Sequence, residues 1–376
     1  MSQGNTMLKT TLMKTTFGKF AVYLVVAMAL IALPLVLQST GSNSWVRIVD
    51  MALLYVLLAL GLNIVVGYAG LLDLGFIAFF AVGAYLYALL ASPHLTETFA
   101  FLAAHFPDGL HMNFWIVMII AGVVAGMTGL ILGAPVLKLR GDYLAIVTLG
   151  FGEIVRIFML NLDRPINITN GPKGISNVDA VTVFGHSMSQ RLTVDFGSWS
   201  YTFESVTLYY YLILFFVLMA IVIAHRLQDS RIGRAWMAIR EDEIAAKAMG
   251  LNTRNLKLAA FGMSATFGGI AGVLFASFMR GVYPESFILM ESVMVVAMVV
   301  LGGLGHIPGV ILGALLLAGL PELLRHVAGP VTEMTGGRLA PEILRQLLIA
   351  MAMVGVMLIR PKGLWPSPEH GKSLAK

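Results

Sequence analysis

Apolar residues along the chain occur in long stretches that are separated by short polar segments. A helix needs about 20 apolar residues to cross about 30 Å of hydrocarbon, and ten stretches approach that length. They cover residues 20–37, 48–66, 71–90, 114–137, 143–162, 208–224, 258–278, 288–304, 309–324 and 343–359. The pattern predicts an all-α polytopic membrane protein with about ten transmembrane helices.

The composition excludes a soluble globular domain. Apolar residues make up 58% of the 376 residues and charged residues only 12%, whereas about a quarter of the residues of a soluble domain are charged. The formal net charge of +5 does not indicate nucleic-acid binding, because Lys and Arg beside membrane segments set orientation. The absence of Cys excludes disulfides and thiolate metal sites.

Ten spans place both termini on one side of the membrane. If that side is the cytoplasm, about 16 of the 25 Lys and Arg residues lie inside and about seven outside, in agreement with the positive-inside rule. We therefore expect a cytoplasmic tail at 1–19, a transmembrane domain at 20–360 and a second cytoplasmic tail at 361–376. The domain carries an external insert at 163–207 and a cytoplasmic loop at 225–257.

The insert leaves two interpretations open, a cap that faces a partner and a simple loop. Its residues 169–174 read TNGPKG, which predicts a turn. Small residues elsewhere predict close helix packing in the bilayer. They form the series Gly122-xxx-Gly126, Gly129-xxx-Gly133, Gly268-xxx-Gly272 and Gly305-xxx-Gly309-xxx-Gly313.

The chain offers no motif for its own ATP or metal chemistry. The only GK[ST] sequence is Gly371-Lys372-Ser373, and Pro366 stands where a P-loop needs a glycine. The eight histidines are scattered, and no H-E-x-x-H motif occurs. We therefore expect no catalytic residues, no metal site and no cofactor bound by this chain.

Polar residues inside the predicted spans are candidates for a translocation pathway. A charge at the bilayer centre costs about 2.5–3.5 kcal/mol on insertion scales, so such residues usually face the bundle interior. In the fifth span, glycine and threonine would expose backbone and hydroxyl groups to a zwitterion. The candidates are Asn63, Asp73, Thr148, Gly150 and Glu153.

The charged residues of these spans have simpler interpretations as well. Glu153 and Arg156 are three residues apart on one helix face and are expected to neutralise each other. A structural pair is favoured over a substrate site there. Asp50, Asp73 and Glu291 lie close enough to span ends that we expect them to be solvated.

Residues 231–257 form the only long polar segment that carries both many charges and a helical pattern. Glu241, Asp242 and Glu243 open a short helix, Lys247 lies in its last turn and Gly250 ends it, as the helix dipole and C-cap preferences require. Asn252 or Thr253 is expected to cap the next helix.

A helix this short is marginal alone, which favours docking of its apolar side into a groove of a soluble partner. The side consists of Ile244, Ala245, Ala248 and Met249, and Trp236 and Ile239 would prolong it upstream. The alternative is an ordinary positively charged cytoplasmic loop.

Several long motifs resemble one known family. The loop AIREDEIAAKAMGLN at 238–252 is similar to an EAA-type coupling loop, with Ala245, Ala246 and Gly250 in place and Ile244 where the classical motif has Glu. GYAGLLDLGFIAFFAVGAY at 67–85, LRGDYLAIVTLGFGEI at 139–154 and MVVLGGLGHIPGVILGA at 298–314 also agree. Together they resemble the branched-chain amino acid permeases of ABC importers, in the M-type rather than the H-type form, over about residues 45–365.

The resemblance implies a permease subunit, similar to type II ABC importers, without an ATPase site of its own. The implied partners are a second homologous permease of the H type, two ABC ATPase subunits that use ATP and Mg, and a periplasmic amino-acid-binding protein. The helix from Glu241 to Gly250 would contact the ATPases, and leucine, isoleucine and valine would be imported across the bacterial inner membrane.

Rival functions remain open from the sequence. Permeases of the same family for urea, short amides or another small solute would keep the mechanism and change the substrate. An ion-coupled secondary transporter would need no partner and would depend on Asp50, Asp73, Glu153 or Glu291. A membrane-embedded enzyme is the weakest alternative, because no nucleophile or metal set is identifiable.

Overall fold

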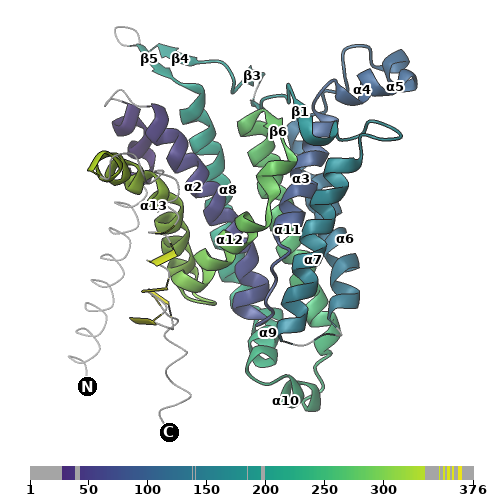
Figure 1. Cartoon of the computed structure of the whole chain (residues 1–376), viewed down its shortest axis with the longest axis vertical. Helices are drawn as coiled ribbons and strands as arrows, with labels where there is room; N and C mark the ends of the chain where they lie inside the picture. The colour runs from purple at the N-terminus through teal and green to yellow at the C-terminus, as the bar shows by residue number, and fades with distance from the viewer. Residues whose placement is uncertain are drawn as a thin grey trace, which may run out of the picture.

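The predicted apolar stretches coincide with helices (Figure 1). The computed structural model describes residues 28–38, 43–137, 139, 141–183, 185–195 and 200–334, the scattered residues 347, 350, 351, 354, 355, 358 and 359, and residues 363–365. The N-terminal tail, the start of the first span, most of the tenth span and most of the C-terminal tail lie outside the described residues. The all-α class is confirmed.

Five helices are long and apolar enough to cross a membrane. They are α2 (Asn43–Asn63) continued by the π-helical turn η1 (Ile64–Tyr68), α6 (Phe114–Val136), α7 (Asp142–Asn161), α8 (Ser205–Gln228) and α11 (Thr253–Met279). Shorter apolar helices occupy the other described spans. They are Met28–Gln38, α3 (Ile77–Leu90), α12 (Leu289–Gly302) and the first part of α13 (Ile307–Met334).

Both glycine-rich span boundaries differ from the prediction. The second span continues through Gly67 as a π-helical turn to Tyr68, and α3 begins only at Ile77, so an irregular segment from 69 to 76 separates them. The eighth and ninth spans are separated by residues 303–306, where Gly303 and Gly305 have φ of 122° and 79°. Leucine and other apolar residues continue into both turns beside Gly, Asp73 and His306, so hydrophobicity alone could not place these helix ends.

Helix α11 lies at the centre of the bundle and packs most extensively on α6 and α3. Its small residues explain the close packing. A Cβ on Gly129 of α6 would lie 2.5 Å from the Cβ of Ala265, and Gly269 and Gly272 of α11 touch the backbones of α6 and α3. The predicted packing role of the glycine series is confirmed there, and also at Gly309 and Gly313, which touch α12.

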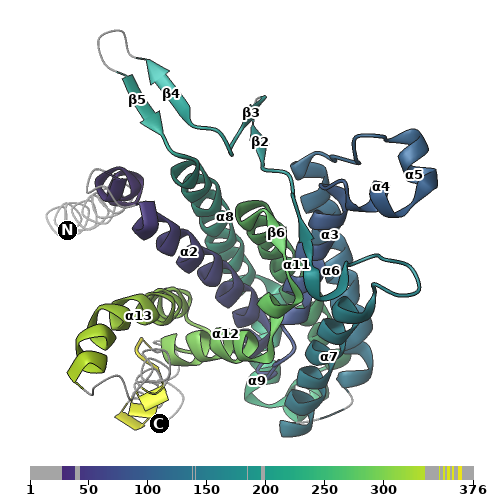
Figure 2. The same cartoon turned by 45° about the horizontal axis from the view of Figure 1, so that its top comes forward.

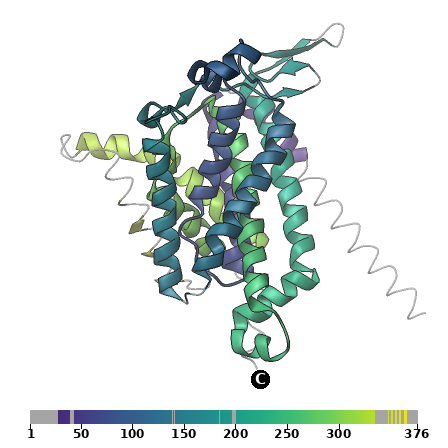
Figure 3. The ribbon, with the colours of Figure 1, turned by 90° about the vertical axis from the view of Figure 1, so that its right-hand side faces the viewer.

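The bundle has two different ends (Figures 1 and 3). One, the helical end, carries α9 (Arg231–Glu241) and α10 (Glu243–Ala248) between α8 and α11. The polar loop is therefore 229–252, shorter than the predicted 225–257, because both flanking helices extend into it. The other, the hairpin end, carries α4 (His94–Thr98), α5 (Ala100–His105) and the insert.

The insert ends at Glu204 rather than at 207, because α8 begins at Ser205. The predicted turn is present as the 3₁₀ turn η2 (Gly171–Lys173). The described part of the chain also forms three antiparallel strand pairs. They pair β1 (Ile175–Ser176) with β6 (Gly281–Val282), β2 (Thr182–Val183) with β3 (His186–Ser187), and β4 (Leu192–Asp195) with β5 (Ser200–Phe203). Of these pairs, β2–β3 and β4–β5 project from the bundle together with α4 and α5 (Figure 2).

Candidate functional site

The short helix α10 owes its position to side-chain caps. Asp242 precedes it, and its Oδ1 accepts hydrogen bonds from the backbone N–H groups of Ile244 and Ala245 at 2.8 and 3.0 Å. Gly250 ends the turn with φ of 88°, and Asn252 caps α11 by accepting a hydrogen bond from Asn255 N at 3.2 Å. The predicted helix from Glu241 to Gly250 is thus divided, because Glu241 belongs to α9 and Asp242 is extended.

One side of α10 is apolar and exposed. Ile244 is 74% exposed and Met249 is 77% exposed, and Ala245 and Ala248 are exposed beside them. Ala246 faces the bundle and is buried. We define the exposed set Ile244, Ala245, Ala248 and Met249 as the α10 face.

Trp236 and Ile239 do not prolong this face. Both are buried, and the indole Nε1 of Trp236 donates to the carbonyl oxygen of Leu256 at 2.7 Å. Lys257 Nζ lies 2.7 Å from Glu243 Oε2. The apolar side of helix α9 thus faces the bundle. The Trp236–Leu256 and Glu243–Lys257 contacts hold α9 and α10 against the start of α11.

Arg240 connects the loop to the two glycine turns. Its guanidinium donates to the carbonyl oxygen of Gly67 in η1, and burial holds the pKa of Arg240 below its usual range. Asn63 is also buried, and its Oδ1 accepts a hydrogen bond from Gly305 N at 2.9 Å. A Cβ on Gly67 would lie 2.7 Å from Gly305 N. We call Asn63, Gly67, Arg240 and Gly305 the Arg240 junction.

The structure brings Asp73 and Thr148 together. Asp73 Oδ1 accepts from Gly75 N at 2.9 Å, and Thr148 Oγ1 accepts from Leu74 N at 3.0 Å. Ser292 of α12 donates to the carbonyl oxygen of Leu74. Side chains of α7 and α12 therefore form hydrogen bonds with backbone groups of the irregular segment 69–76. Backbone polar groups inside a membrane need such partners. This arrangement supports a structural role.

The other predicted pathway residues do not join this cluster. Asn63 belongs to the Arg240 junction. Gly150 has open space where a Cβ would stand. Glu153 pairs with Arg156, whose Nε lies 3.0 Å from both carboxylate oxygens, so the expected mutual pair is present. The five candidates thus do not form one cluster.

The expectation that Asp50, Asp73 and Glu291 are solvated is wrong for the first two. Asp50 and Asp73 are buried, and neither carboxylate oxygen of Asp50 has a hydrogen-bond partner among the described residues. Helix α2 begins before the predicted end, at Asn43, which places Asp50 inside it, whereas Asp73 lies in the irregular segment 69–76 that packs against α7 and α12. Glu291 is partly buried, and Tyr55 donates to its Oε2 at 2.7 Å.

A cavity beside Glu291 was not predicted from the sequence. Its volume is about 210 Å³, and no local motif indicated Tyr55, since its partners come from distant helices. The lining residues are Met51, Leu54, Tyr55, Leu58, Ile77, Phe80, Phe275, Met279, Ser286 and Glu291. We call it the Glu291 cavity.

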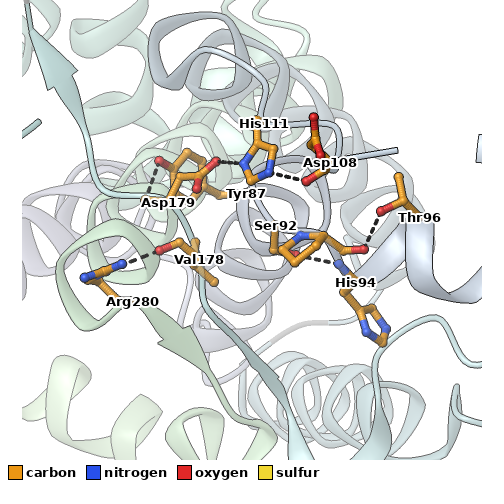
Figure 4. A network of polar contacts seen from close by, with 10 residues as sticks. Tyr87, Ser92, His94, Thr96, Asp108, His111, Val178, Asp179 and Arg280 are labelled. Atoms are coloured by element: carbon orange, nitrogen blue, oxygen red, sulfur yellow. Dashed lines mark hydrogen bonds and ion pairs between the residues drawn. The ribbon is translucent and has the colours of Figure 1, made fainter. Parts of the chain in front are cut away.

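At the hairpin end, the insert is fastened to the bundle by a polar network (Figure 4). His111 lies 2.6 Å from a carboxylate oxygen of Asp179 and 2.6 Å from the carbonyl oxygen of Asp108, and these contacts raise the pKa of His111. Tyr87 donates to the carbonyl oxygen of Asp179 at 3.0 Å. A cavity of about 450 Å³ with Arg280 in its wall adjoins this network.

No group of three or more acidic or histidine side chains suited to a metal occurs in the described part of the chain. The arrangement has apolar spanning helices, an irregular segment held inside the bundle, and an exposed apolar face on a capped loop. It defines a polytopic helical membrane protein.

The family follows from comparison with known proteins. A family model described as the permease component of branched-chain amino acid transport systems matches residues 44–358, and the chain belongs to this family. The chain is 42% identical over 349 residues to the high-affinity branched-chain amino acid transport system permease protein LivM of Escherichia coli K12, covering 90% of this chain and 74% of that protein. This confirms the M-type resemblance.

More distant relatives include both types of permease. The chain is 26% identical over 336 residues to the probable branched-chain amino acid transport permease protein LivM of Methanocaldococcus jannaschii, covering 83% of this chain and 90% of that protein. It is 26% identical over 334 residues to the LivH permease protein of Escherichia coli K12, covering 85% of this chain and 93% of that protein. No solved structure matches.

Proposed function

We propose that the chain is one permease subunit of an ATP-driven importer for leucine, isoleucine and valine in the bacterial inner membrane. The 42% identity to a protein named as a high-affinity branched-chain amino acid permease supports the substrate class. Similarity to both LivM and LivH proteins supports a pair of homologous permeases in one importer. ATP and Mg would be used by two partner ATPase subunits, and a periplasmic binding protein would deliver the substrate.

The helical end is proposed to face the cytoplasm. Residues 225–257 at this end carry seven Lys and Arg residues, whereas residues 91–113 at the hairpin end carry none. The positive-inside rule favours this orientation. Both termini would then be cytoplasmic, and the insert at 163–207 would face the binding protein.

The α10 face is proposed to be the contact with an ATPase. The observation that carries this proposal is the exposure of Ile244 and Met249 on a helix outside the spanning segments. Apolar side chains that lie outside the bilayer and expose about three quarters of their surface are typical of a docking surface. The coupling segment comprises Glu241, Asp242, Glu243, Ile244, Ala245, Ala246, Ala248, Met249 and Gly250.

The Arg240 junction supports a route by which movement of the ATPases would reach the spanning helices. A displacement of α9 and α10 reaches Gly67 through the Arg240 guanidinium, and Gly67 abuts the turn between α12 and α13. Movement of α12 against α2 would then alternate access to the interior. The short packed contacts make these turns move together.

The test is a matched pair of charge insertions in the complete importer, reconstituted in vesicles with both permeases, the ATPases and the binding protein. Ile244→Asp places a charge in the proposed contact, and Phe101→Asp places one at an equally exposed residue, 74%, of the hairpin end. We expect Ile244→Asp to weaken ATPase association and ATP-dependent leucine uptake at least about tenfold, because a desolvated charge at an interface core is costly. Phe101→Asp should leave ATPase association unchanged.

Two results would contradict the proposal. Equal ATPase association of Ile244→Asp and the unmodified chain would remove the α10 face from the contact. Leucine uptake by this chain alone, driven by an ion gradient without ATP, would replace the importer by a secondary transporter. ATP-dependent uptake of urea but not leucine would overturn only the substrate.

A further inference from the structure

The Glu291 cavity lies where five elements meet. Helix α2 contributes residues at positions 51, 54, 55 and 58, which form one face of that helix, and α3, α11, η3 (Pro284–Phe287) and α12 supply the rest. Tyr55 is twelve residues from the hairpin-end start of α2, which corresponds to about 18 Å of helix. The cavity therefore lies at about mid-membrane depth.

Glu291 gives this cavity one charge. It lies in the first turn of α12, at the positive end of the helix dipole. Tyr55 OH donates to Oε2 at 2.7 Å, and none of the ion pairs among the described residues includes Glu291. The lining contains no Lys, Arg or His. A carboxylate at this depth is stabilised by a cation, so the charge is suited to a ligand that brings one.

The remaining wall is apolar. The rings of Phe80 and Phe275 pack at a tilt of 54° with centroids 5.1 Å apart, and leucine, isoleucine and methionine side chains surround them. A volume of about 210 Å³ is smaller than the roughly 300–1,000 Å³ of pockets for drug-sized ligands. It suits one small solute with an aliphatic part, rather than a peptide.

Arg47 stands at the outer rim. Its Nη2 lies 3.6 Å from Sδ of Met279, which lines the cavity, and Arg47 is one helical turn closer to the hairpin end than Met51. Arg47 is not part of the lining, but a zwitterion that entered from the hairpin end would pass this cation before it reached the Glu291 carboxylate. An amino acid that entered with its ammonium group first could place the ammonium at Glu291 and its carboxylate near Arg47.

We propose that the Glu291 cavity is a binding site on the transport route for a zwitterionic amino acid with an aliphatic side chain. The substrate ammonium binds Glu291, Tyr55 holds that carboxylate in place, and the aliphatic side chain lies against Phe80 and Phe275. This assignment rests on the proposed function and adds a site to it. It also differs from a purely structural link between α2 and α12, which would need no ligand.

The chain contains no cysteine, so a single thiol can report on the cavity. Ser286 lines it, whereas its neighbour Glu285 is exposed and does not. Ser286→Cys and Glu285→Cys variants of the complete importer are labelled with a small methanethiosulfonate, and the label on this chain is counted by mass spectrometry. We expect leucine to slow labelling of S286C at least about tenfold, since charge-assisted hydrogen bonds contribute about 1.5–3 kcal/mol, and to leave E285C unaffected.

Two further measurements separate the ammonium contact from simple filling of the cavity. The deaminated analogue 4-methylpentanoate should not protect S286C, and Glu291→Gln in the same chain should abolish protection by leucine. In uptake assays Glu291→Gln should raise the KM for leucine about tenfold, whereas Glu285→Gln should not. If the S286C variant does not assemble, the KM values of Glu291→Gln and Glu285→Gln decide whether Glu291 binds the substrate.

Unchanged labelling of S286C in the presence of leucine, or equal protection by leucine and the analogue, overturns the site. An importer that takes up leucine with ATP but shows no protection refutes the cavity and leaves the proposed function intact. Conversely, loss of ATP-dependent leucine uptake by the unmodified importer refutes the proposed function, while protection of S286C by leucine is judged independently.

Discussion

The two ends of the bundle are built in different ways. At the helical end, local caps define α10: Asp242 starts it, Gly250 ends it, and the α10 face remains exposed. At the hairpin end, β1 pairs with β6 across more than one hundred residues, and Tyr209 links Val181 to Ser277. A locally encoded element with an uncovered apolar side suits contact with a partner, whereas distant pairings suit a rigid platform.

The strongest test of this contrast is Arg240→Ala. It removes the link from α9 to Gly67 but leaves α10 and its caps unchanged. We expect ATPase activity to persist while leucine uptake falls about tenfold or more, because a hydrogen bond from a charged donor contributes about 1.5–3 kcal/mol. Uptake and ATP hydrolysis are measured on the same reconstituted importer.

Arg231→Ala is the matched control, since Arg231 lies on the same helix and is exposed. It should alter neither activity by more than about twofold, as is usual for exposed surface substitutions. If Arg240→Ala reduces ATP hydrolysis and uptake in parallel, Arg240 acts on assembly rather than on transmission.

An intermediate effect is expected at Gly250. Its φ of 88° strains a side chain, yet a Cβ there would meet no other atom within 4 Å, so a substitution acts through the backbone alone. Gly250→Val should reduce uptake several-fold, since such a conformation costs about 1–3 kcal/mol for an unsuited residue. Gly250→Asn should stay near the unmodified rate, because Asn adopts positive φ more readily. Equal behaviour of the two variants would show that the end of α10 needs no such turn.

The smallest effect is expected at the hairpin end and depends on pH. Protonated His111 donates to both Asp179 and Asp108, and these contacts raise its pKa. The stabilisation is therefore fully present below about pH 6.5, the ordinary value, and is lost as pH rises through the raised pKa. Hydrogen exchange of residues 175–183, corrected for intrinsic rates, should become about twofold faster across that range.

His111→Asn is the control, because Asn does not titrate and tolerates the positive φ of 38° at this position. Its exchange should not change with pH. Arg280, in the wall of the same cavity, is present in the unmodified chain and in the variant. An identical pH dependence in His111→Asn would assign the effect to another group.

The sequence was informative where short-range chemistry decides the structure. The capped helix near Asp242 and Gly250 was predicted from residues within one turn of each end. Trp236 and Ile239 were assigned to the wrong surface, because helical spacing shows that they share a side but not what that side faces. The start of α3 at Ile77 was missed since the residues before it are apolar as well.

The transport residues were harder to predict, because their partners are distant in the chain. Thr148 meets the turn at Leu74, Asn63 meets Gly305, and Tyr55 meets Glu291. Each polar residue was visible in its apolar span except Tyr55, which looks like an ordinary aromatic residue. Only packing of the helices reveals that Tyr55 and Glu291 share a cavity.

The shortness of α12 has a consequence for the surrounding lipid. Its 14 residues extend about 21 Å, against a hydrocarbon thickness of about 30 Å. A bilayer in contact with its exposed residues Met290 and Val293 would have to become thinner there. This costs free energy for every ångström by which helix length and bilayer thickness differ. The longer helices α6 and α8, of 23 and 24 residues, match the acyl chains better.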